Sequence, residues 1–423
     1  MRLRRAGSGL IRRILATFSV VFVLVGASWA GSTLKVLYSF KGGTDGSFPS
    51  YQLLIDPAGN LYGITLDGGS TTDCYGSGCG TVFQLMPRDG RWAETVLYSI
   101  PASTSPYPDP NGPLVRDGSG SLFGVIAYGG DPVCQCGEIY ELTRSAGVWT
   151  ETDIHNFVGG NSDGQYLNPG LVRDSAGNFY GSTGEGGNGE NCNSECGTIF
   201  EFTPNSDGSW TENLIYNFTG GRDGENPGGP MTIDAEGNLY GITTSGGVYG
   251  YGTAYKLALS NGAWAETTLF DFTIDASGGS VSQISGIAVD SFGDLFAVAP
   301  YGGGNQVGIV YELTPTAGYS KCLALHTFTG AGDGGEPFGG LSIDKAGNLY
   351  GTTIYGGTYE YGTVYRLAPG KGGRWSETVL HSFSNGNDGS YPYGVILDSS
   401  GNLYGTAIEG GANGYGVAYE LTQ

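Results

Sequence analysis

Residues 344–351 read DKAGNLYG, and this phrase returns along the chain with small variations. Its pattern is an aspartate, two variable residues, a glycine and then Asn-Leu-Tyr-Gly. The leading aspartates are 54 to 61 residues apart, a regular period that indicates stacked supersecondary units. They stand at Asp56, Asp117, Asp174, Asp234, Asp290, Asp344 and Asp398.

Two further phrases give the same number of units. A phrase of the type Gly-Thr-Val-Phe-x-Leu begins at Gly80, Gly137, Gly197, Gly252, Gly308, Gly362 and Gly416. A third phrase, of the type Leu-Tyr-x-Phe, ends at Phe40, Ile100, Phe157, Phe218, Phe272, Phe328 and Phe383. The three phrases together predict seven units.

Each unit is predicted to contain four strands, which we call A, B, C and D. In the first unit they cover residues 51–55, 60–66, 80–86 and 92–100. Alternating apolar and polar residues, rich in β-branched and aromatic types, favour strands over helices. The Asp-x-x-Gly between A and B suits a type I turn followed by a left-handed glycine. Seven four-stranded units predict an all-β, seven-bladed β-propeller.

The two ends of the mature chain carry complementary parts of one unit. Residues 36–40 read VLYSF and match a D strand, whereas the last unit ends with a C strand at residues 416–421. We predict that the N-terminal strand completes the last blade, closes the ring and removes an exposed sheet edge. An open β-solenoid with capping units is the alternative, and the complementary ends disfavour it.

The repeats resemble the GloVer tandem repeats of bacterial exported proteins. The resemblance rests on Gly-Asn-Leu-Tyr-Gly-Thr-Thr at 347–353, on Gly-Gly-x-x-x-x-Gly-Thr-Val-Tyr at 356–365 and on the Asp-Gly-x-x-Pro loops. It extends over nearly the whole mature chain and implies a secreted or surface repeat protein whose biochemical role is not established. Members of that family often carry a variable C-terminal sorting anchor, and this sequence departs from them by ending within its last blade.

Residues 1–30 are predicted to be a secretory signal. Five arginines precede an apolar run at 14–27, and Ser28-Trp29-Ala30 offers small residues for cleavage after Ala30. The apolar run is too short for a membrane-spanning helix, which needs about 20 residues. We therefore expect a propeller over residues 31–423, secreted, periplasmic or on the cell surface, and no membrane insertion after cleavage.

The charge of the mature chain excludes some classes of partner. Without the signal, 14 basic residues face 40 acidic ones. Nucleic acids and anionic membranes need basic patches, so we expect neither as a partner. A monomer that binds a carbohydrate or another exported protein is the expected form.

Six of the seven cysteines form local pairs just before a C strand. We predict the disulfides Cys74–Cys79 and Cys192–Cys196 and, as a much smaller ring, Cys134–Cys136, because exported proteins meet oxidising conditions. Metal binding or redox chemistry is the alternative for these pairs. Cys322 has no neighbour in sequence and is predicted to be free.

The histidines and the glutamates of the D strands are given structural roles. His155, His326 and His381 stand where other D strands carry Tyr38, Tyr98, Tyr216 or Phe270, so we expect them to fill the space of an aromatic ring. Each of five glutamates follows a tryptophan by two residues and shares its strand face: Glu94, Glu151, Glu212, Glu266 and Glu377. Cross-strand pairing and blade-to-blade packing explain them better than acid/base catalysis. We predict no catalytic residue and no protein-bound metal, because neither a zinc spacing nor a Ser/His/Asp set is present.

The connections from D to the next A strand supply the candidate ligand site. An Asp-Gly pair recurs there at Asp45, Asp163, Asp223, Asp333 and Asp388, with looser versions at Asp109 and Asp275. In a propeller these connections share one face with the B–C connections, which carry Tyr249, Tyr251, Tyr359, Tyr361 and Tyr415. Asp-Gly is a common turn pair, and a turn is the simpler explanation.

Aspartates and tyrosines gathered on one face are also suited to a ligand. Tyrosine rings stack on sugars, and carboxylates can bind calcium, although no loop has the spacing of a known calcium site. We therefore predict a non-catalytic binding or scaffolding module. We expect no cofactor, with bound calcium as the alternative. The alternative is a glycosidase or lyase, whose two carboxylates must flank one bond.

Overall fold

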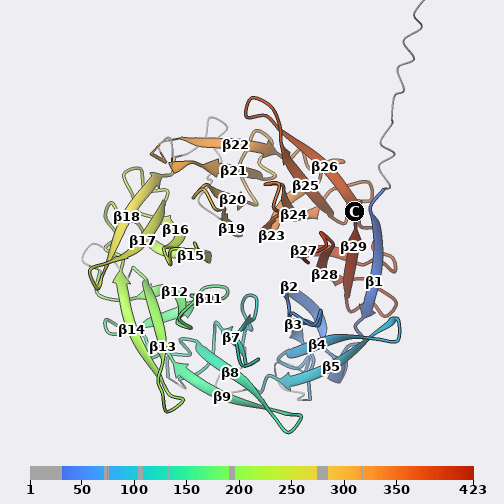
Figure 1. Cartoon of the computed structure of the whole chain (residues 1–423), viewed down its shortest axis with the longest axis horizontal. Helices are drawn as coiled ribbons and strands as arrows, with labels where there is room; N and C mark the ends of the chain where they lie inside the picture. The colour runs from blue at the N-terminus through green and yellow to red at the C-terminus, as the bar shows by residue number, and fades with distance from the viewer. Residues whose placement is uncertain are drawn as a thin grey trace, which may run out of the picture. The chain divides into compact units, whose positions relative to one another are not determined.

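The computed structural model describes residues 31–423, except 71–73, 75, 103–107, 132, 190–195, 274–283, 316–317 and 320. Residues Ser32–Gln423 form one compact unit, in which seven antiparallel sheets surround a central axis (Figure 1). The prediction of a seven-bladed β-propeller is confirmed. The predicted signal, residues 1–30, lies outside the described residues. In the described part of the chain, no helix has both the length and the apolar character needed to cross a membrane.

The first four blades follow one another in the order A, B, C and D. Blade 1 contains β2 (Ser47–Ile55), β3 (Leu61–Asp67), β4 (Thr81–Arg88) and β5 (Arg91–Ser99). Blade 2 contains β6 (Val115–Arg116), β7 (Leu122–Ile126), β8 (Glu138–Ser145) and β9 (Val148–Asn156). Blade 3 contains β10 (Gly164–Leu167), β11 (Val172–Arg173), β12 (Phe179–Gly186), β13 (Thr198–Pro204) and β14 (Trp210–Asn217). Blade 4 contains β15 (Glu225–Ile233), β16 (Leu239–Ser245), β17 (Thr253–Ser260) and β18 (Ala263–Asp271).

The last three blades repeat this order. Blade 5 contains β19 (Gly286–Val289), β20 (Leu295–Ala299), β21 (Ile309–Leu313) and β22 (Cys322–Thr327). Blade 6 contains β23 (Gly335–Ile343), β24 (Leu349–Tyr355), β25 (Thr363–Pro369) and β26 (Trp375–Ser382). Blade 7 contains β27 (Ser390–Leu397), β28 (Leu403–Glu409), β29 (Val417–Thr422) and, as its outer strand, β1 (Thr33–Ser39). One short 3₁₀ helix, η1 (Gly43–Asp45), follows β1.

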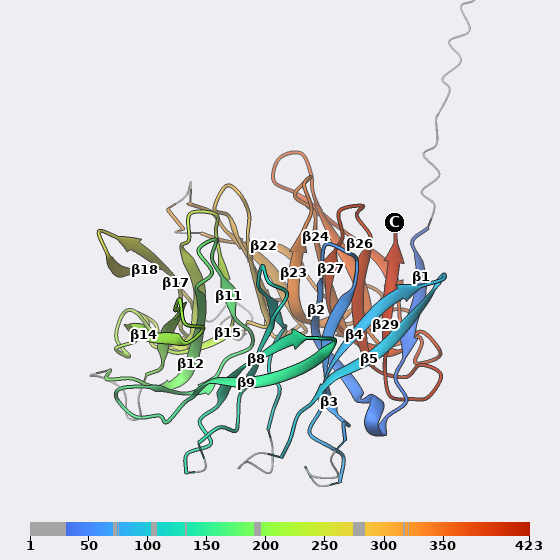
Figure 2. The ribbon, with the colours of Figure 1, turned by 60° about the horizontal axis from the view of Figure 1, so that its bottom comes forward.

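The ring is closed by the first strand of the propeller. β1 pairs antiparallel with β29, from Thr33 opposite Thr422 to Ser39 opposite Val417. The two strands lie side by side at the edge of blade 7 in both views (Figures 1 and 2). Closure by the N-terminal strand, predicted from the complementary chain ends, is therefore confirmed.

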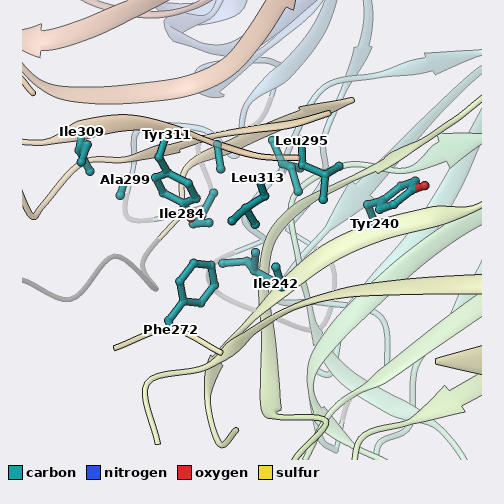
Figure 3. Close-up of a cluster of buried hydrophobic side chains, with 12 residues drawn as sticks. Tyr240, Ile242, Phe272, Ile284, Leu295, Ala299, Ile309, Tyr311 and Leu313 are labelled. Atoms are coloured by element: carbon teal, nitrogen blue, oxygen red, sulfur yellow. The ribbon is translucent and has the colours of Figure 1, made fainter. Parts of the chain in front are cut away.

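The hydrophobic core is divided into seven clusters, and each one fills the space between two neighbouring blades. Figure 3 shows the cluster between blades 4 and 5, where Phe272 and Ile242 face residues of β20 and β21. The residue that ends each D-strand phrase is fully buried in such a cluster. At the seam between blades 5 and 6, for example, the ring of Phe328 lies 5.1 Å from that of Tyr365. Because these contacts cross from one blade to the next, burial of apolar surface holds the ring together.

Close packing explains why Leu-Tyr-Gly and Gly-Thr-Val-Tyr repeat together. Strand B of blade 6 pairs Gly351 with Tyr365 of strand C, and the tyrosine ring passes over the glycine. A Cβ atom on Gly351 would lie 2.4 Å from the Tyr365 hydroxyl, so only glycine fits under the ring. Beside them, the hydroxyls of Thr353 and Thr363 are 2.9 Å apart and bond to each other in the buried interior.

The cysteine pairs follow the prediction as far as the structure describes them. Cys74–Cys79 and Cys134–Cys136 are disulfides. Cys196 is disulfide-bonded, and its predicted partner Cys192 lies outside the described residues. Cys322 is a free, exposed cysteine, as predicted.

Candidate functional site

The D–A and B–C connections lie on one face of the ring and are bonded to each other. In blade 4 the amide of Gly247, in the B–C connection, donates to the carbonyl of Gly221 in the D–A connection, at 2.9 Å. Gly69 and Gly43 make the same bond in blade 1, and Gly411 and Gly386 make it in blade 7. We call this surface the D–A/B–C face.

The five Asp-Gly aspartates lie on this face and fix its loops. In each loop the carboxylate accepts a hydrogen bond from the first amide after the buried phenylalanine that ends strand D. The amides belong to Lys41, Val158, Thr219, Thr329 and Ser384, and the distances are 2.8 to 3.0 Å. All five carboxylates therefore close tight turns, which is the simpler of the two explanations of the Asp-Gly pairs: Asp45, Asp163, Asp223, Asp333 and Asp388.

A residue of strand D completes each of these loops. Tyr38 donates its hydroxyl proton to Asp45 at 2.6 Å, and Tyr216 donates to Asp223 at 2.9 Å. In the other three loops the Nε2 atoms of His155, His326 and His381 lie 3.1 to 3.4 Å from the carboxylate. The histidines thus stand in the space of tyrosines, as predicted, and they also take over the polar contact of the tyrosine hydroxyl.

Little of these carboxylates is open to solvent. The side chain of Asp163 is 6% exposed and that of Asp388 is 19% exposed. The role in ligand binding that the sequence suggested for the five aspartates stays a prediction. Of the two looser versions, Asp275 lies outside the described residues.

Exposed tyrosines gather on the D–A/B–C face. Every exposed tyrosine among the described residues lies in its connections or at the strand ends that border it: Tyr128, Tyr166, Tyr249, Tyr301, Tyr355, Tyr359 and Tyr415. Of the three tyrosines that we assigned to ligand binding, Tyr415 is exposed, whereas Tyr251 and Tyr361 are half-buried against the core. Tyr128, Tyr166, Tyr301 and Tyr355 did not stand out in the sequence, because other blades carry other residue types at the same repeat positions.

A groove of about 500 Å³ crosses blades 2 to 4 on this face. The rings of Tyr128 and Tyr166 lie 5.5 Å apart beside it. Its polar lining includes two carboxylates, those of Asp109 and Glu185, and the amides of Asn111, Asn168 and Asn226. The groove therefore combines aromatic rings with hydrogen-bonding groups, as ligand sites commonly do.

The polar groups of the groove are held in place before any ligand arrives. The Asn168 amide donates to the Pro227 carbonyl at 2.7 Å, and Glu185 accepts a bond from Gln165 at 2.7 Å. Asn111 donates to the Leu167 carbonyl and accepts a bond from Tyr51. Burial raises the pKa of Asp109 above its ordinary value of 3.8.

The central channel, about 600 Å³ in volume, is lined by the A strands. Its wall loses the repeat symmetry at the position five residues before the A–B aspartate, where Tyr51 and Tyr393 replace smaller residues. Their rings are 5.1 Å apart, and Phe338 lies 4.9 Å from Tyr393. Tyr51 has φ +63°, in the region that favours glycine, and Gly229 occupies that position in blade 4 with φ +72°. The three repeated phrases do not include this position, and only an alignment of the seven A strands would have revealed the aromatic group.

The opposite face carries the Asp-x-x-Gly hairpins. Asp56 accepts bonds from the amides of Ala58 and Asn60 and from the Tyr62 hydroxyl. Burial alone would raise the pKa of Asp56, but the bonds from the Asn60 side chain and backbone outweigh it and lower the pKa. The same contacts recur at Asp234, Asp344 and Asp398, so hairpin geometry explains these residues.

The glutamates of the D strands form a second repeated feature, at the outer seams between blades. Burial raises the pKa of Glu94, Glu151, Glu212, Glu266 and Glu377 to about 7. In four of these seams an Asp-Gly aspartate also acts on the glutamate: Asp45, Asp163, Asp223 and Asp333. Cross-strand pairing and blade-to-blade packing, our interpretation of the sequence, place these glutamates at the seams but do not identify the aspartates, which are 43 to 49 residues away in sequence.

The comparisons with known proteins agree with this architecture. A family model described as "Gloeobacter/Verrucomicrobia repeat" matches residues 23–193, 109–341 and 287–423. No curated protein matches the sequence. Among solved structures, virginiamycin B lyase from Staphylococcus aureus is similar, with a TM-score of 0.54 and 14% identity over 93% of this chain and 99% of that one.

A second similar structure is PorZ, a bacterial surface component of the type-IX secretion system of Porphyromonas gingivalis. It has a TM-score of 0.51 and 17% identity, and the match covers 90% of this chain but only 47% of PorZ. At such identities, both likenesses show a shared propeller fold and leave the function to be argued from the site.

Proposed function

The chain belongs to the Gloeobacter/Verrucomicrobia repeat family, and from its geometry we propose that it is an exported, non-catalytic module that binds a carbohydrate on its D–A/B–C face. The observation that carries this proposal is the gathering of exposed tyrosines on that face, next to a groove lined by carboxylates and amides. Sugars offer apolar C–H faces to aromatic rings and hydroxyls to polar groups. Export is supported by the arginine-rich, apolar start of the sequence.

The groove between blades 2 and 4 is proposed as the main site. A sugar ring stacked on Tyr128 and Tyr166 would lie within reach of the Asp109 and Glu185 carboxylates and the Asn226 amide. A second aromatic group, Tyr355, Tyr361 and Tyr391, spans blades 6 and 7, with rings 5.6 and 6.1 Å from that of Tyr391. A face with two such groups is suited to a long or branched glycan.

The test is a glycan array probed with the exported chain, followed by titration of the best glycan against variants. Tyr128→Ala and Tyr166→Ala remove one stacking ring each and should weaken binding about tenfold, the equivalent of about 1.4 kcal/mol. Tyr128→Phe keeps the ring and should retain most of the affinity.

Phe292→Ala is the matched control, because Phe292 is 82% exposed and lies in an A–B hairpin on the opposite face. If Phe292→Ala weakens binding as much as Tyr166→Ala does, the site is not on the D–A/B–C face. If the protein binds no glycan on the array, the proposal of carbohydrate binding is wrong. Another exported protein would then be the partner to test.

A carbohydrate-active enzyme is the second candidate, and one observation favours it. Asp109 breaks the pattern of the loop aspartates: it lines the groove, and burial raises its pKa, which suits a proton donor. Prolonged incubation of the bound glycan with the protein, analysed by mass spectrometry, separates the two functions. Cleavage products that disappear in Asp109→Asn would establish the enzyme.

A further inference from the structure

We propose that His155, Asp163 and Glu212 form a binding site for one divalent transition-metal ion, zinc being the ion that fits best, at the outer seam between blades 2 and 3. This inference is independent of the carbohydrate site. The three residues come from β9, from the D–A connection after it and from β14. An ion held there would connect the outer strands of two neighbouring blades.

The distances suit a tetrahedral ion. The Nε2 atom of His155 lies 3.4 Å from an oxygen of Asp163 and 3.4 Å from an oxygen of Glu212. The three ligand atoms all lie within 4.8 Å of one another. Ligands at about 2.1 Å from a tetrahedral zinc ion are separated by about 3.4 Å. Two of the three separations therefore have the required length, and the third, between the Asp163 and Glu212 oxygens, is at most 4.8 Å.

The contacts are too long to be good hydrogen bonds. A normal N–H···O bond spans about 2.7–3.2 Å, and His155 lies beyond that range from both carboxylates. The imidazole is equally distant from two carboxylates, an arrangement that a cation bound to all three groups would satisfy.

The surrounding chain holds two of the ligands firmly. The His155 ring packs between Phe157 and Phe202, with ring centres 4.6 and 5.4 Å away. The Asp163 carboxylate is fixed by the amides of Val158 and Gly164. The side chains of His155 and Glu212 are 25% and 20% exposed, so water can enter and complete the coordination.

The other two histidine seams lack this arrangement. His326 contacts Asp333, but in the described part of the chain it forms no ion pair with Glu377. His381 contacts Asp388, and the position of the glutamate is taken by Leu34 of β1. Tyr216, Asp223 and Glu266 form the equivalent seam with a phenol in place of the imidazole. These three seams lack the full ligand set and can therefore be compared directly with the seam of His155.

The ligand types indicate the class of ion. One imidazole and two carboxylates suit zinc and its first-row neighbours, whereas calcium takes oxygen ligands alone and in larger number. Without an ion, burial would lower the pKa of His155, but Asp163 and the charge of Glu212 outweigh it and raise the pKa. Burial raises the pKa of Glu212 to about 7. A bound ion must therefore displace protons from both residues.

The test is zinc titration by calorimetry of the purified chain, without an affinity tag and with Cys322→Ser to remove the free thiol. We expect one zinc ion per chain, proton release on binding, affinity that rises from pH 6 to pH 8, and a higher melting temperature with zinc. His155→Tyr recreates the neighbouring tyrosine seam and should fold; it should lower the zinc affinity at least ~10-fold. Glu212→Gln should lower it as well.

His326→Tyr is the matched control, since it makes the same replacement in a seam without the full ligand set. It should leave zinc affinity unchanged. No bound zinc in the parent chain, equal affinity in His155→Tyr, or equal losses in His155→Tyr and His326→Tyr would each overturn the proposal. Calcium that competes as strongly as zinc would overturn the assignment to a transition metal.

Discussion

A single aspartate connects each complete Asp-Gly loop to strand D. Asp223 accepts bonds from the Tyr216 hydroxyl of strand D, from the Thr219 amide and from the Thr219 hydroxyl. It is 8% exposed, so these bonds are shielded from water. Removing a buried acceptor leaves its donors unsatisfied, which costs about 1–3 kcal/mol.

We therefore expect Asp223→Ala to lower the free energy of unfolding by about 1–3 kcal/mol and to leave the affinity for a glycan at the Tyr128 and Tyr166 groove unchanged. Denaturant unfolding and glycan titration on the same variant measure both effects. Asp207→Ala is the control, because Asp207 bonds only to Ser209 in its own exposed hairpin. A variant of normal stability with weakened binding would show instead that Asp223 contacts the ligand, as the sequence suggested.

The outer strands place five carboxyls in positions that disfavour their charge. Each D-strand glutamate is partly buried at the seam with the preceding blade, and in four seams a loop aspartate acts on it. The fifth, Glu151, is affected by burial and then by Asp153, and it accepts a bond from Tyr98. These glutamates stay protonated to about pH 7 in the folded chain, compared with an ordinary pKa of 4.5.

This arrangement predicts that the propeller loses stability as the pH rises from about 5 to 8. Between the unfolded pKa of 4.5 and the folded pKa of about 7, the folded state binds more protons, so raising the pH favours unfolding. His155, with a raised pKa, acts in the same direction, whereas His326 and His381, whose pKa values burial lowers, act against it. The aspartates with lowered pKa values lose their contribution only below about pH 4, outside this window.

Melting temperatures measured from pH 5 to pH 8 in a metal-free buffer check this expectation. Glu266→Gln removes one of the titrating carboxyls and should flatten the profile. Glu236→Gln is the control, because Glu236 lies on an exposed hairpin. A melting temperature that is constant or rises towards pH 8 would contradict the argument.

The molecule as a whole depends on one pairing between its two ends. β1 is the outer strand of blade 7, and it also brings Leu37 and Phe40 into the core cluster shared with blade 1. Phe40 is fully buried, and its ring lies 5.0 Å from that of Phe83. The strand therefore seals the sheet edge of blade 7 and fills the last seam of the ring.

Deletion of residues 31–40 should expose the edge of β29 and open that seam. We expect aggregation or a large loss in melting temperature, measured by light scattering and calorimetry. The point variant Phe40→Ala should cost about 3–5 kcal/mol by leaving a cavity.

Lys35→Ala is the control within the same strand, since the Lys35 side chain is 57% exposed and its ion pair with Glu420 lies at the surface. It should change the stability little. A deletion variant that stays monomeric and melts like the parent chain would mean that β1 does not hold the ring closed.

The sequence alone determined the number of blades, the four strands of each blade and the way in which the ring closes. These features are local and repeated: each phrase, such as Leu-Tyr-Gly with its partner Gly-Thr-Val-Tyr, packs within one blade, and every copy supports the others. The pairing of Cys74 with Cys79 was equally accessible, because the two residues are neighbours in sequence.

Only the tertiary structure decided which side chains meet across the seams and which ones water reaches. Asp163 and Glu212 are 49 residues apart in sequence and meet because adjacent blades pack side by side. Tyr251 and Tyr415 occupy matching repeat positions, yet Tyr251 packs on the core and Tyr415 is exposed. Contact and exposure depend on how neighbouring blades fill the same space, and a pattern read along one strand does not contain that information.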